Sequence, residues 1–359
     1  MKCLSEANIN AHLNRPVTPE GQFITLWRPS SSFIHCCIES CGCRYSQESG
    51  SCIMCDYGVG RNLTPAELQS ALYEELSPCI EKIDRLLFGS YGSVMDESEV
   101  SAECFQVLLR FLCDNPVPNV IFETHCETVK RDKLKKIREE LPADIQTTIE
   151  MGYESSDPFI LQSCLNKVLN LDVLERAIML IHEEGMHVCL NVFLGAPFLC
   201  PVDQLVSAKN SVLWAMERGV DSIALFPANI KPFTLVHKLY KKGLYAPLSH
   251  WMIPALFRVL PDEALERITL SWYGDRKNFY KGDTFPLIPP QDCDRCHEDL
   301  FSFYHEFMRE PDGYKRAEMT RVLWEKDLSC NCRENLKVAL HTYTPRRTAK
   351  QINQIVSSL

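Results

Sequence analysis

The stretch Gly42-Cys43-Arg44-Tyr45-Ser46-Gln47-Glu48-Ser49-Gly50-Ser51-Cys52-Ile53-Met54-Cys55-Asp56-Tyr57-Gly58 carries three cysteines with the spacing C-x8-C-x2-C. Its glycines and serines argue against one continuous helix, so a loop can bring Cys43 to Cys52 and Cys55. Three thiolates with an open fourth position suit an iron–sulfur cluster that acts on a substrate, whereas a closed zinc site requires four ligands. The spacing alone leaves two alternatives open, a structural zinc knuckle and a set in which Cys41 replaces Cys43.

The composition is that of an ordinary globular protein, with 45% apolar and 24% charged residues. No apolar run is long enough to span a bilayer, and the first residues lack the apolar region of a secretion signal. The 18 cysteines then indicate a reducing compartment, where clustered thiols bind metals more often than they form disulfides. We therefore expect a cytoplasmic protein without membrane attachment. The net charge of −9 disfavours a broad nucleic-acid footprint but leaves room for a local basic groove.

At 359 residues the chain exceeds the usual size of one compact core. We expect an irregular segment over 1–30, a core domain over 31–235 and an extension over 236–359. In the core domain, stretches typical of strands alternate with stretches typical of helices, which predicts an α/β fold with a parallel sheet: a barrel, a partial barrel or a doubly wound sheet. The six expected strands lie at 32–38, 85–89, 119–123, 145–151, 187–193 and 221–226.

Polar residues follow these strands where catalytic groups of such folds are found. They include Gly89-Ser90-Tyr91-Gly92-Ser93, Glu123-Thr124-His125, Glu150-Met151-Gly152-Tyr153-Glu154-Ser155 and, within the fifth strand, Asn191. Each has a structural explanation, because Gly and Ser form turns and a carboxylate after a strand often caps a helix. Their gathering at one edge of the sheet with the cysteine loop indicates a site.

The order of these features resembles that of the radical S-adenosylmethionine (radical SAM) enzymes. Their usual cysteine spacing is C-x3-C-x2-C, and this chain departs from it in the first gap. The departure resembles the branch of the archaeosine-synthase radical SAM partner, a relative of the elongator catalytic subunit. That branch has a Gly-Cys-Arg start, a longer gap rich in Gly and Ser, and a final C-x2-C-x-Tyr. The likeness covers roughly residues 33–240 and resumes near the C-terminus.

The resemblance implies that Cys43, Cys52 and Cys55 hold a [4Fe-4S] cluster whose fourth iron position binds S-adenosylmethionine. Reductive cleavage would give a 5′-deoxyadenosyl radical that abstracts hydrogen from an organic substrate, with an electron donor such as flavodoxin or ferredoxin as a partner. The segment 88–96 resembles the one whose backbone holds the amino group of S-adenosylmethionine, and 150–155 resembles the E-x-G-x-E-S segment near its carboxylate and ribose. The residues expected to bind the cofactor are Tyr57, Gly89, Ser90, Tyr91, Gly92, Ser93, Glu123, Glu150, Gly152, Glu154, Ser155 and Asn191.

A second cysteine set lies near the C-terminus, where Cys293 and Cys296 form a C-x2-C pair and Cys330 and Cys332 a C-x-C pair. Two close pairs with polar flanks predict a four-sulfur metal site, either zinc or a second iron–sulfur cluster. The neighbouring His297 is an alternative ligand. Between the two cysteine sets, the aromatic stretch with Trp251, Trp272, Tyr273 and Asp275 either covers the mouth of the barrel or packs in the core.

The predicted function is therefore a radical SAM enzyme with a substrate of one of two kinds. The resemblance suggests a modified tRNA nucleoside, whereas the acidic balance favours a small metabolite or a peptide in a biosynthetic pathway. Two other classes stay open: a non-catalytic zinc-binding interaction protein, and an electron-transfer protein that does not cleave S-adenosylmethionine.

Overall fold

The computed structural model describes residues 2–12, 21–57, 60–271 and 287–359. Their strands form one eight-stranded sheet in the order of the sequence. β1 pairs antiparallel with β2, and every later strand pairs parallel with the one before it. The strands are β1 (Ile24–Ser30), β2 (Phe33–Ile38), β3 (Arg85–Ser90), β4 (Asn119–Thr124), β5 (Gln146–Glu154), β6 (His187–Leu194), β7 (Ser222–Pro227) and β8 (Ile268–Leu270).

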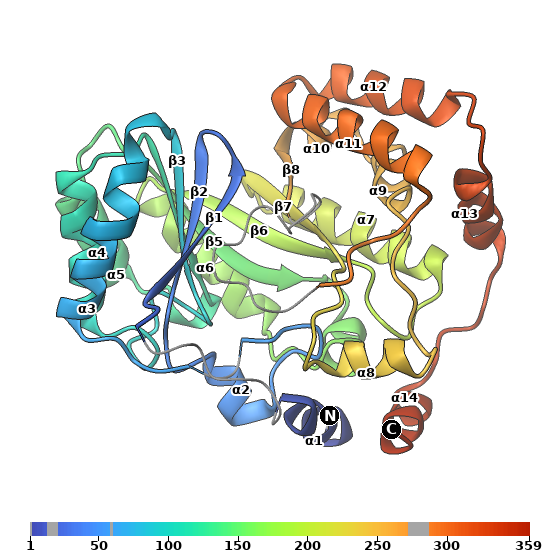
Figure 1. The fold of residues 1–359 in the computed structure, drawn as a ribbon, viewed down its shortest axis with the longest axis horizontal. Helices are drawn as coiled ribbons and strands as arrows, with labels where there is room; N and C mark the ends of the chain where they lie inside the picture. The colour runs from blue at the N-terminus through green and yellow to red at the C-terminus, as the bar shows by residue number, and fades with distance from the viewer. Residues whose placement is uncertain (1, 13–20, 58–59, 272–286) are drawn as a thin grey trace.

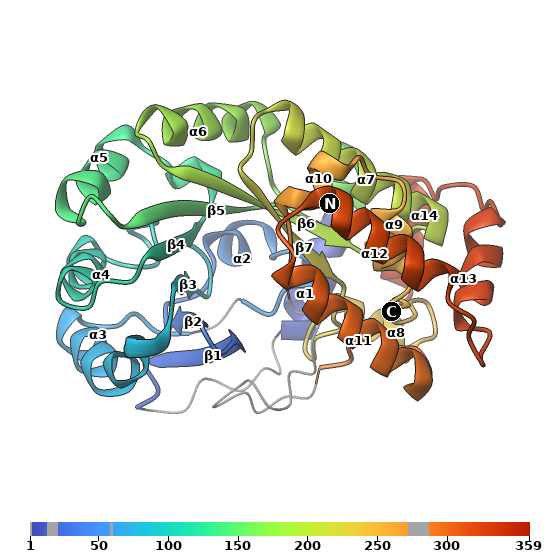
Figure 2. The same cartoon turned by 90° about the horizontal axis from the view of Figure 1, so that it is seen from above.

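The sheet curls into part of a barrel, and its outer face is covered by helices (Figures 1 and 2). Each of the six predicted strands is present, as β2 to β7, with helical segments between them. The α/β class and the partial barrel are thereby confirmed. The covering helices are α3 (Pro65–Ala71), α4 (Ala102–Asp114), α5 (Arg131–Glu140), α6 (Leu171–Glu183) and α7 (Pro201–Glu217).

The two faces of the sheet differ in polarity, because successive side chains of a strand point to opposite faces. On β5, Ile149, Met151 and Tyr153 are fully buried in the core under the helices, and the Tyr153 ring stacks on Trp214 of α7. The alternate residues Glu150, Gly152 and Glu154 therefore lie on the concave face. Barrel enzymes hold their ligands at the end of the barrel where the parallel strands terminate.

The described residues among the first 30 are not irregular as predicted, since they form helix α1 (Lys2–His12) and strand β1. β1 gains its hydrogen bonds from β2, to which it is joined by a tight turn. α1 buries Leu4 and Ala11 and packs against α8 (Leu235–Lys241) and α14 (Ala349–Ser357). Both elements depend on contacts with distant segments, which local sequence does not reveal.

The C-terminal part is helical, apart from β8, which extends the sheet beyond the predicted core domain. The remaining helices are α2 (Arg44–Ser49), α9 (Met252–Phe257), α10 (Asp262–Arg267), α11 (Asp294–Arg309), α12 (Gly313–Glu325) and α13 (Cys332–His341). α14 returns to α1, so the two ends of the chain meet below the barrel (Figure 1). None of the described helices is long and apolar enough to cross a membrane.

Trp251 is fully buried in the core, where it faces Trp324, so core packing describes it better than a cover over the mouth. Trp272, Tyr273 and Asp275 lie outside the described residues.

Candidate functional site

The cysteine loop follows β2 and lies at the edge of the sheet where the parallel strands end. Cys43 is the N-cap of the short helix α2, which ends at Gly50 with a left-handed φ of 81°. Gly50 has the backbone freedom that this turn requires, and a Cβ there would lie 2.7 Å from the Ser5 Cα of α1. Cys52 and Cys55 come directly after the turn. The stretch is thus interrupted as predicted, with one short helix between its first and second cysteines.

Three polar side chains from distant segments hold this loop. The Asn8 amide of α1 donates to Gly50 O at 2.7 Å, and His12 Nε2 lies 3.0 Å from Cys55 O. The Asn166 amide donates to Ser51 O at 2.7 Å and to Ser49 O at 3.0 Å. Asn8 and Asn166 are at least 97% buried, so these bonds are shielded from water. The loop is thus fixed on both sides, by α1 and by Asn166.

Burial raises the pKa of Cys43, and the Cys55 and Cys52 thiols of the same loop act in the same direction. The three thiols do not form one of the groups of described residues whose ligand atoms all lie within 4.8 Å of one another. Four thiolates around one zinc ion lie only about 3.8 Å apart, given tetrahedral bonds of about 2.3 Å. At least one pair of the loop's sulfurs is therefore farther apart than the sulfurs around a single zinc ion.

Cys43 and Cys41 differ in their surroundings. Cys43 is buried and faces the other two thiols, whereas the half-buried Cys41 donates from Sγ to Ser98 O at 3.2 Å. The alternative set with Cys41 is thus not supported by the geometry.

Cys43 also meets Glu99 and His125, and one ligand atom from each of the three residues lies within 4.8 Å of the others. His125 Nε2 lies 3.5 Å from Cys43 Sγ and 3.8 Å from Glu99 Oε1. Burial lowers the pKa of His125 to about 4, so its imidazole is neutral at pH 7. Burial raises the pKa of Glu99 to about 7, although the carboxylate accepts backbone N–H bonds from Arg44 and Ser93. This network fixes the start of α2 and with it Cys43.

A buried cation lies beside the thiols. Lys167 Nζ is 3.4 Å from Glu154 Oε1, and the two side chains are 7% and 13% exposed. Burial acts to lower the pKa of Lys167, but Glu154 and the Cys52 and Cys43 thiols outweigh it and raise the pKa. Lys167 is therefore positively charged, and it offsets negative charge on thiolates and on Glu154.

Two glycines of the predicted set are required for close approach. A Cβ at Gly92 would lie 1.8 Å from Glu99 Oε2 and 2.9 Å from the Cys43 Cα. A Cβ at Gly152 would lie 2.9 Å from Lys167 Nζ. These positions let the strand ends come close to the cysteine loop and to Lys167.

Three serines of the predicted set already use their hydroxyl groups within the protein. Ser90 Oγ accepts the Gly92 N–H at 3.2 Å, and Ser93 Oγ bonds the Thr124 hydroxyl. Ser155 Oγ lies 3.1 Å from Ser207 Oγ and accepts the Asp157 N–H. These hydroxyl groups stabilise the loops after β3 and β5 through bonds within the protein.

The remaining cofactor candidates lie around the mouth and on the concave face. Tyr57 faces Tyr91, with ring centroids 5.8 Å apart. The Lys231 ammonium sits 4.6 Å from the Tyr57 ring centroid and 2.7 Å from Asp56 Oδ1. Gly89, Glu123, Glu150 and Asn191 belong to the inner positions of β3, β4, β5 and β6. A Cβ at Gly89 would lie 2.6 Å from Glu123 Oε2.

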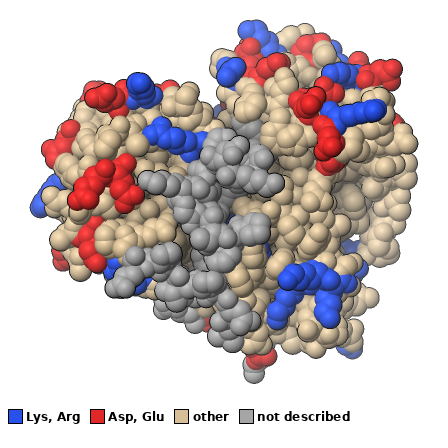
Figure 3. Space-filling model, in the orientation of Figure 1, with Lys and Arg blue, Asp and Glu red and all other residues tan. Residues whose placement is uncertain are grey.

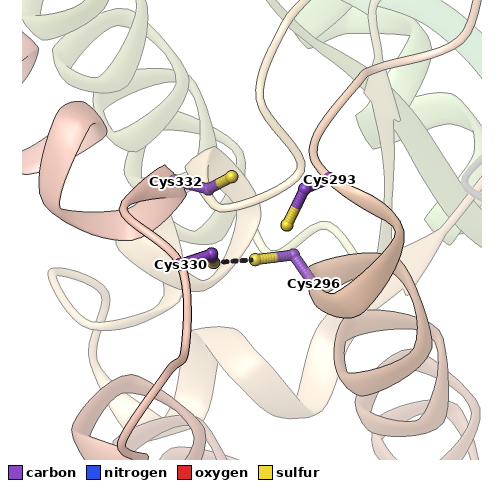
Figure 4. A group of neighbouring side chains, drawn as sticks. All are labelled: Cys293, Cys296, Cys330 and Cys332. Carbon is purple, nitrogen blue, oxygen red and sulfur yellow. Dashed lines mark hydrogen bonds between the residues drawn. The ribbon is translucent and has the colours of Figure 1, made fainter.

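The second cysteine set forms a closed group (Figure 4). The sulfur atoms of Cys293, Cys296, Cys330 and Cys332 all lie within 4.8 Å of one another, and those of Cys296 and Cys330 are 3.1 Å apart. The Trp251 indole donates to Cys296 Sγ at 3.2 Å. The predicted grouping of the four cysteines is thus confirmed, and their spacing matches a tetrahedral four-sulfur site. His297 stacks on Phe301, with ring centroids 4.0 Å apart, and is not part of this group.

Sequence reasoning missed Asn8, His12 and Glu99 entirely. None follows a strand or stands in a metal-binding spacing. Asn8 and His12 do share one face of α1, four residues apart, which is the available signal once that helix is known.

The sequence matches no protein-family profile, and no curated protein is significantly similar to it. Among solved structures, similar chains include a radical S-adenosylmethionine methyltransferase, TsrM, from Kitasatospora setae, with 15% identity over 54% of this chain and 35% of that chain and a TM-score of 0.36. The archaeal Elp3 of Methanocaldococcus infernus has 13% identity over 68% and 58%, with a TM-score of 0.45. Methylornithine synthase (PylB) has 13% identity over 94% and 90%, with a TM-score of 0.48. At such low identities and TM-scores we base no conclusion about activity on these similarities.

Proposed function

We propose that this protein is a radical SAM enzyme in which Cys43, Cys52 and Cys55 hold a [4Fe-4S] cluster. The observation that carries the proposal is the fixed three-cysteine loop at the strand ends of a partial parallel barrel. At least one pair of its sulfurs is farther apart than the sulfurs around one zinc ion. An iron–sulfur cluster binds each thiolate through a different iron and leaves one iron position open.

The surroundings of the loop fit such a group. A cluster with three thiolates is anionic, and the Lys167 ammonium lies next to Cys52 and Cys43. Burial raises the pKa of Cys55 to about 12, while Lys231 acts in the opposite direction. Thiols with raised pKa values require a bound metal to become thiolates at pH 7. The loop is therefore suited to metal binding and not to nucleophilic catalysis by a free thiolate.

When bound, the cluster would supply the electron that cleaves S-adenosylmethionine to a 5′-deoxyadenosyl radical, which abstracts hydrogen from an organic substrate. The chain itself would orient the cofactor. Gly92 and Gly152 leave room for it at the ends of β3 and β5, and Glu154, held by Lys167, can accept hydrogen bonds from ribose hydroxyls or an ammonium group. Tyr57 and Tyr91 would cover its apolar face, and the electron would come from a donor such as flavodoxin or ferredoxin.

The substrate we favour is a small metabolite or a peptide of a biosynthetic pathway. On the face shown in Figure 3, acidic and basic side chains of the described residues are interspersed, apart from a basic group at the lower right. In Figure 1 that region is occupied by α8, which carries Lys238 and Lys241. A tRNA would require more extensive positive charge, so a modified tRNA nucleoside is the second candidate.

For the second site we propose one zinc ion with a structural role. Its four sulfurs are as close as a closed tetrahedral zinc site requires, and a [4Fe-4S] cluster would spread them further.

The test is anaerobic reconstitution followed by assays of iron, sulfide and 5′-deoxyadenosine formed under reduction. We expect about four irons per chain and 5′-deoxyadenosine from the wild type, and neither from a Cys43→Ala/Cys52→Ala/Cys55→Ala variant. A Cys3→Ala/Cys79→Ala/Cys113→Ala variant is the matched control, because these three cysteines lie outside both sets and should keep both properties. A wild type that carries only zinc and forms no 5′-deoxyadenosine would instead be a zinc-binding interaction protein. A wild type with iron but without cleavage would be an electron-transfer protein.

A further inference from the structure

The concave face of the sheet carries a group of hydrogen-bond acceptors beside the residues that we assign to the cofactor. We infer that Glu123, Glu150 and Asn191 form a second ligand site, which binds a cationic nitrogen group of the substrate, such as a primary ammonium. The identification of this ligand as the substrate rests on the proposed function. The presence of a cation site does not.

The three residues are neighbours on adjacent strands. Glu123 of β4 and Glu150 of β5 are directly paired in the parallel register, so their side chains project side by side on the same face about 4.8 Å apart at the backbone. Asn191 of β6 pairs with Gly152, and its side chain acts to lower the pKa of the Glu150 carboxyl. Glu150 and Asn191 are each only 5% exposed.

The group lacks a cation of its own. No Lys or Arg nitrogen of the described residues lies within the ion-pair distance of Glu123 or Glu150, in contrast to Glu154, which has Lys167. Within the same part of the chain, Asn191 Oδ1 has no hydrogen-bond partner although it is buried. A buried unpaired acceptor is costly, and a ligand with N–H donors would satisfy it.

The electrostatics favour the same ligand. Burial and the neighbouring carboxyl raise the pKa of Glu123 to about 8, and burial raises that of Glu150 to about 7. The cations Lys231 and Lys167 act on Glu123 and Arg85 acts on Glu150, all in the opposite direction. These three cations lower the two pKa values too little to offset burial. A cation bound between the two carboxylates would lower both pKa values further, because it favours their charged forms.

On β5, Glu150 is one inward-facing position below Gly152, which we assign to the cofactor. Glu154 lies at the mouth with Lys167 and the thiols, whereas Glu150 is four residues earlier on β5. The Glu154 carboxylate reaches back to Gly152, where a Cβ would lie 3.3 Å from Glu154 Oε1, so at about 3.3 Å per residue Glu150 lies about 7 Å deeper along the strand than that carboxylate. A substrate held there by its cationic end would extend toward the mouth, where hydrogen abstraction would take place.

The alternative is that the two carboxyls share one proton and serve only the structure. The test therefore measures binding of n-butylammonium by saturation-transfer NMR on the reconstituted full-length protein at about pH 9, above the pKa of both carboxyls. The neutral molecule of matching shape is n-butanol. We expect the ammonium to bind about tenfold or more tightly than the alcohol, a preference worth about 1.4 kcal/mol.

The isosteric variants Glu123→Gln and Glu150→Gln should each weaken ammonium binding about tenfold. Glu184→Gln should not, because Glu184 is equally buried but pairs with Arg131 and Arg138 away from the concave face. If wild type and both site variants bind n-butylammonium equally, the inference is wrong. The two carboxyls would then share a proton and have a structural role only. Circular dichroism of each variant verifies that it folds.

The titration is repeated on wild type with saturating S-adenosylmethionine. We expect unchanged ammonium affinity, whereas displacement would assign these carboxylates to the cofactor ammonium and overturn a separate site. 5′-Deoxyadenosine formation by the same wild-type sample distinguishes the two proposals. If the protein cleaves S-adenosylmethionine but does not bind n-butylammonium, only this inference is rejected. If it binds n-butylammonium but does not cleave S-adenosylmethionine, the proposed function is rejected and the cation site serves another purpose.

Discussion

At the scale of single residues, Gly92 links the cysteine loop to the sheet. A Cβ there would overlap the Glu99 carboxylate and touch the Cys43 backbone, so we expect Gly92→Ala to displace Cys43. The variant should lose most of its bound iron in anaerobic reconstitution and unfold at a temperature several degrees lower, as strained core substitutions typically cost about 1–3 kcal/mol.

The matched control for this change is Gly219→Ala. Gly219 has a left-handed φ of 71° but nothing within 4 Å of a Cβ, so this variant should lose only about 1 kcal/mol of stability and keep its iron. Normal iron content in Gly92→Ala would show that the contact between Glu99 and Cys43 does not position the ligand.

Glu150 should make the stability of the ligand-free protein depend on pH. Its pKa in the folded state is about 7, above the value of about 4.3 for an unfolded chain. Its contribution to stability is therefore complete below about pH 4 and is lost as the pH rises through about 7. Glu150→Gln removes this loss, so the melting temperature of the variant relative to wild type should rise between about pH 5 and pH 9, by roughly 2–4 °C for each kcal/mol. A difference that is constant over this range would contradict the raised pKa.

The sequence allowed Cys43, Cys52 and Cys55 to be predicted because metal-binding cysteines cluster locally in a chain. Glu150 and Glu154 could be predicted because the ends of parallel strands meet at one edge. Glu99 and Asn8 could not, since each acts through a contact with a residue more than 40 positions away. The roles of the predicted cofactor residues remain predictions that the binding experiments above address.

At the scale of elements, α1 acts as a support for the cysteine loop. The Asn8 side chain joins Gly50 O to the Leu235 N–H at the start of α8, with distances of 2.7 and 3.1 Å. Asn8→Ala would leave both buried groups unsatisfied, which costs about 1–3 kcal/mol each. We expect a lower melting temperature and faster release of iron to a chelator.

Asn10→Ala is the control for this prediction, because Asn10 is on the same helix but exposed and should change stability by no more than about 0.5 kcal/mol. Equal rates of iron release from the two variants would mean that α1 covers the loop without holding it.

Helices and strands could be predicted where their own residues show a clear apolar pattern. The strands β2 to β7 are apolar stretches bounded by turn residues, which is a strong local signal. β8 has only three residues, and β1 depends on pairing with β2, so neither has a comparable signal. α1 has its buried face completed by α14 from the opposite end of the chain, which no local pattern can indicate.

At the scale of the whole molecule, the four-cysteine site joins segments that are far apart in the C-terminal part. Cys293 caps α11, whereas Cys330 and Cys332 lie at the start of α13. Between the pairs, α11 and α12 pack on the barrel through α9 and α10. A metal ion at this site would therefore hold α13 against the rest of the molecule.

Removal of one ligand should open this site without affecting the cysteine loop. We expect Cys330→Ser to lose about one zinc per chain, to melt at least about 5 °C lower, since structural zinc contributes several kcal/mol, and to become sensitive to trypsin around α13. Its iron content should stay that of wild type, because the two cysteine sets share no residue. Cys113→Ser, at an exposed cysteine outside both sets, should change none of these properties. Loss of iron in place of zinc from Cys330→Ser would instead indicate that the C-terminal cysteines bind a second cluster, and that the molecule contains two redox centres.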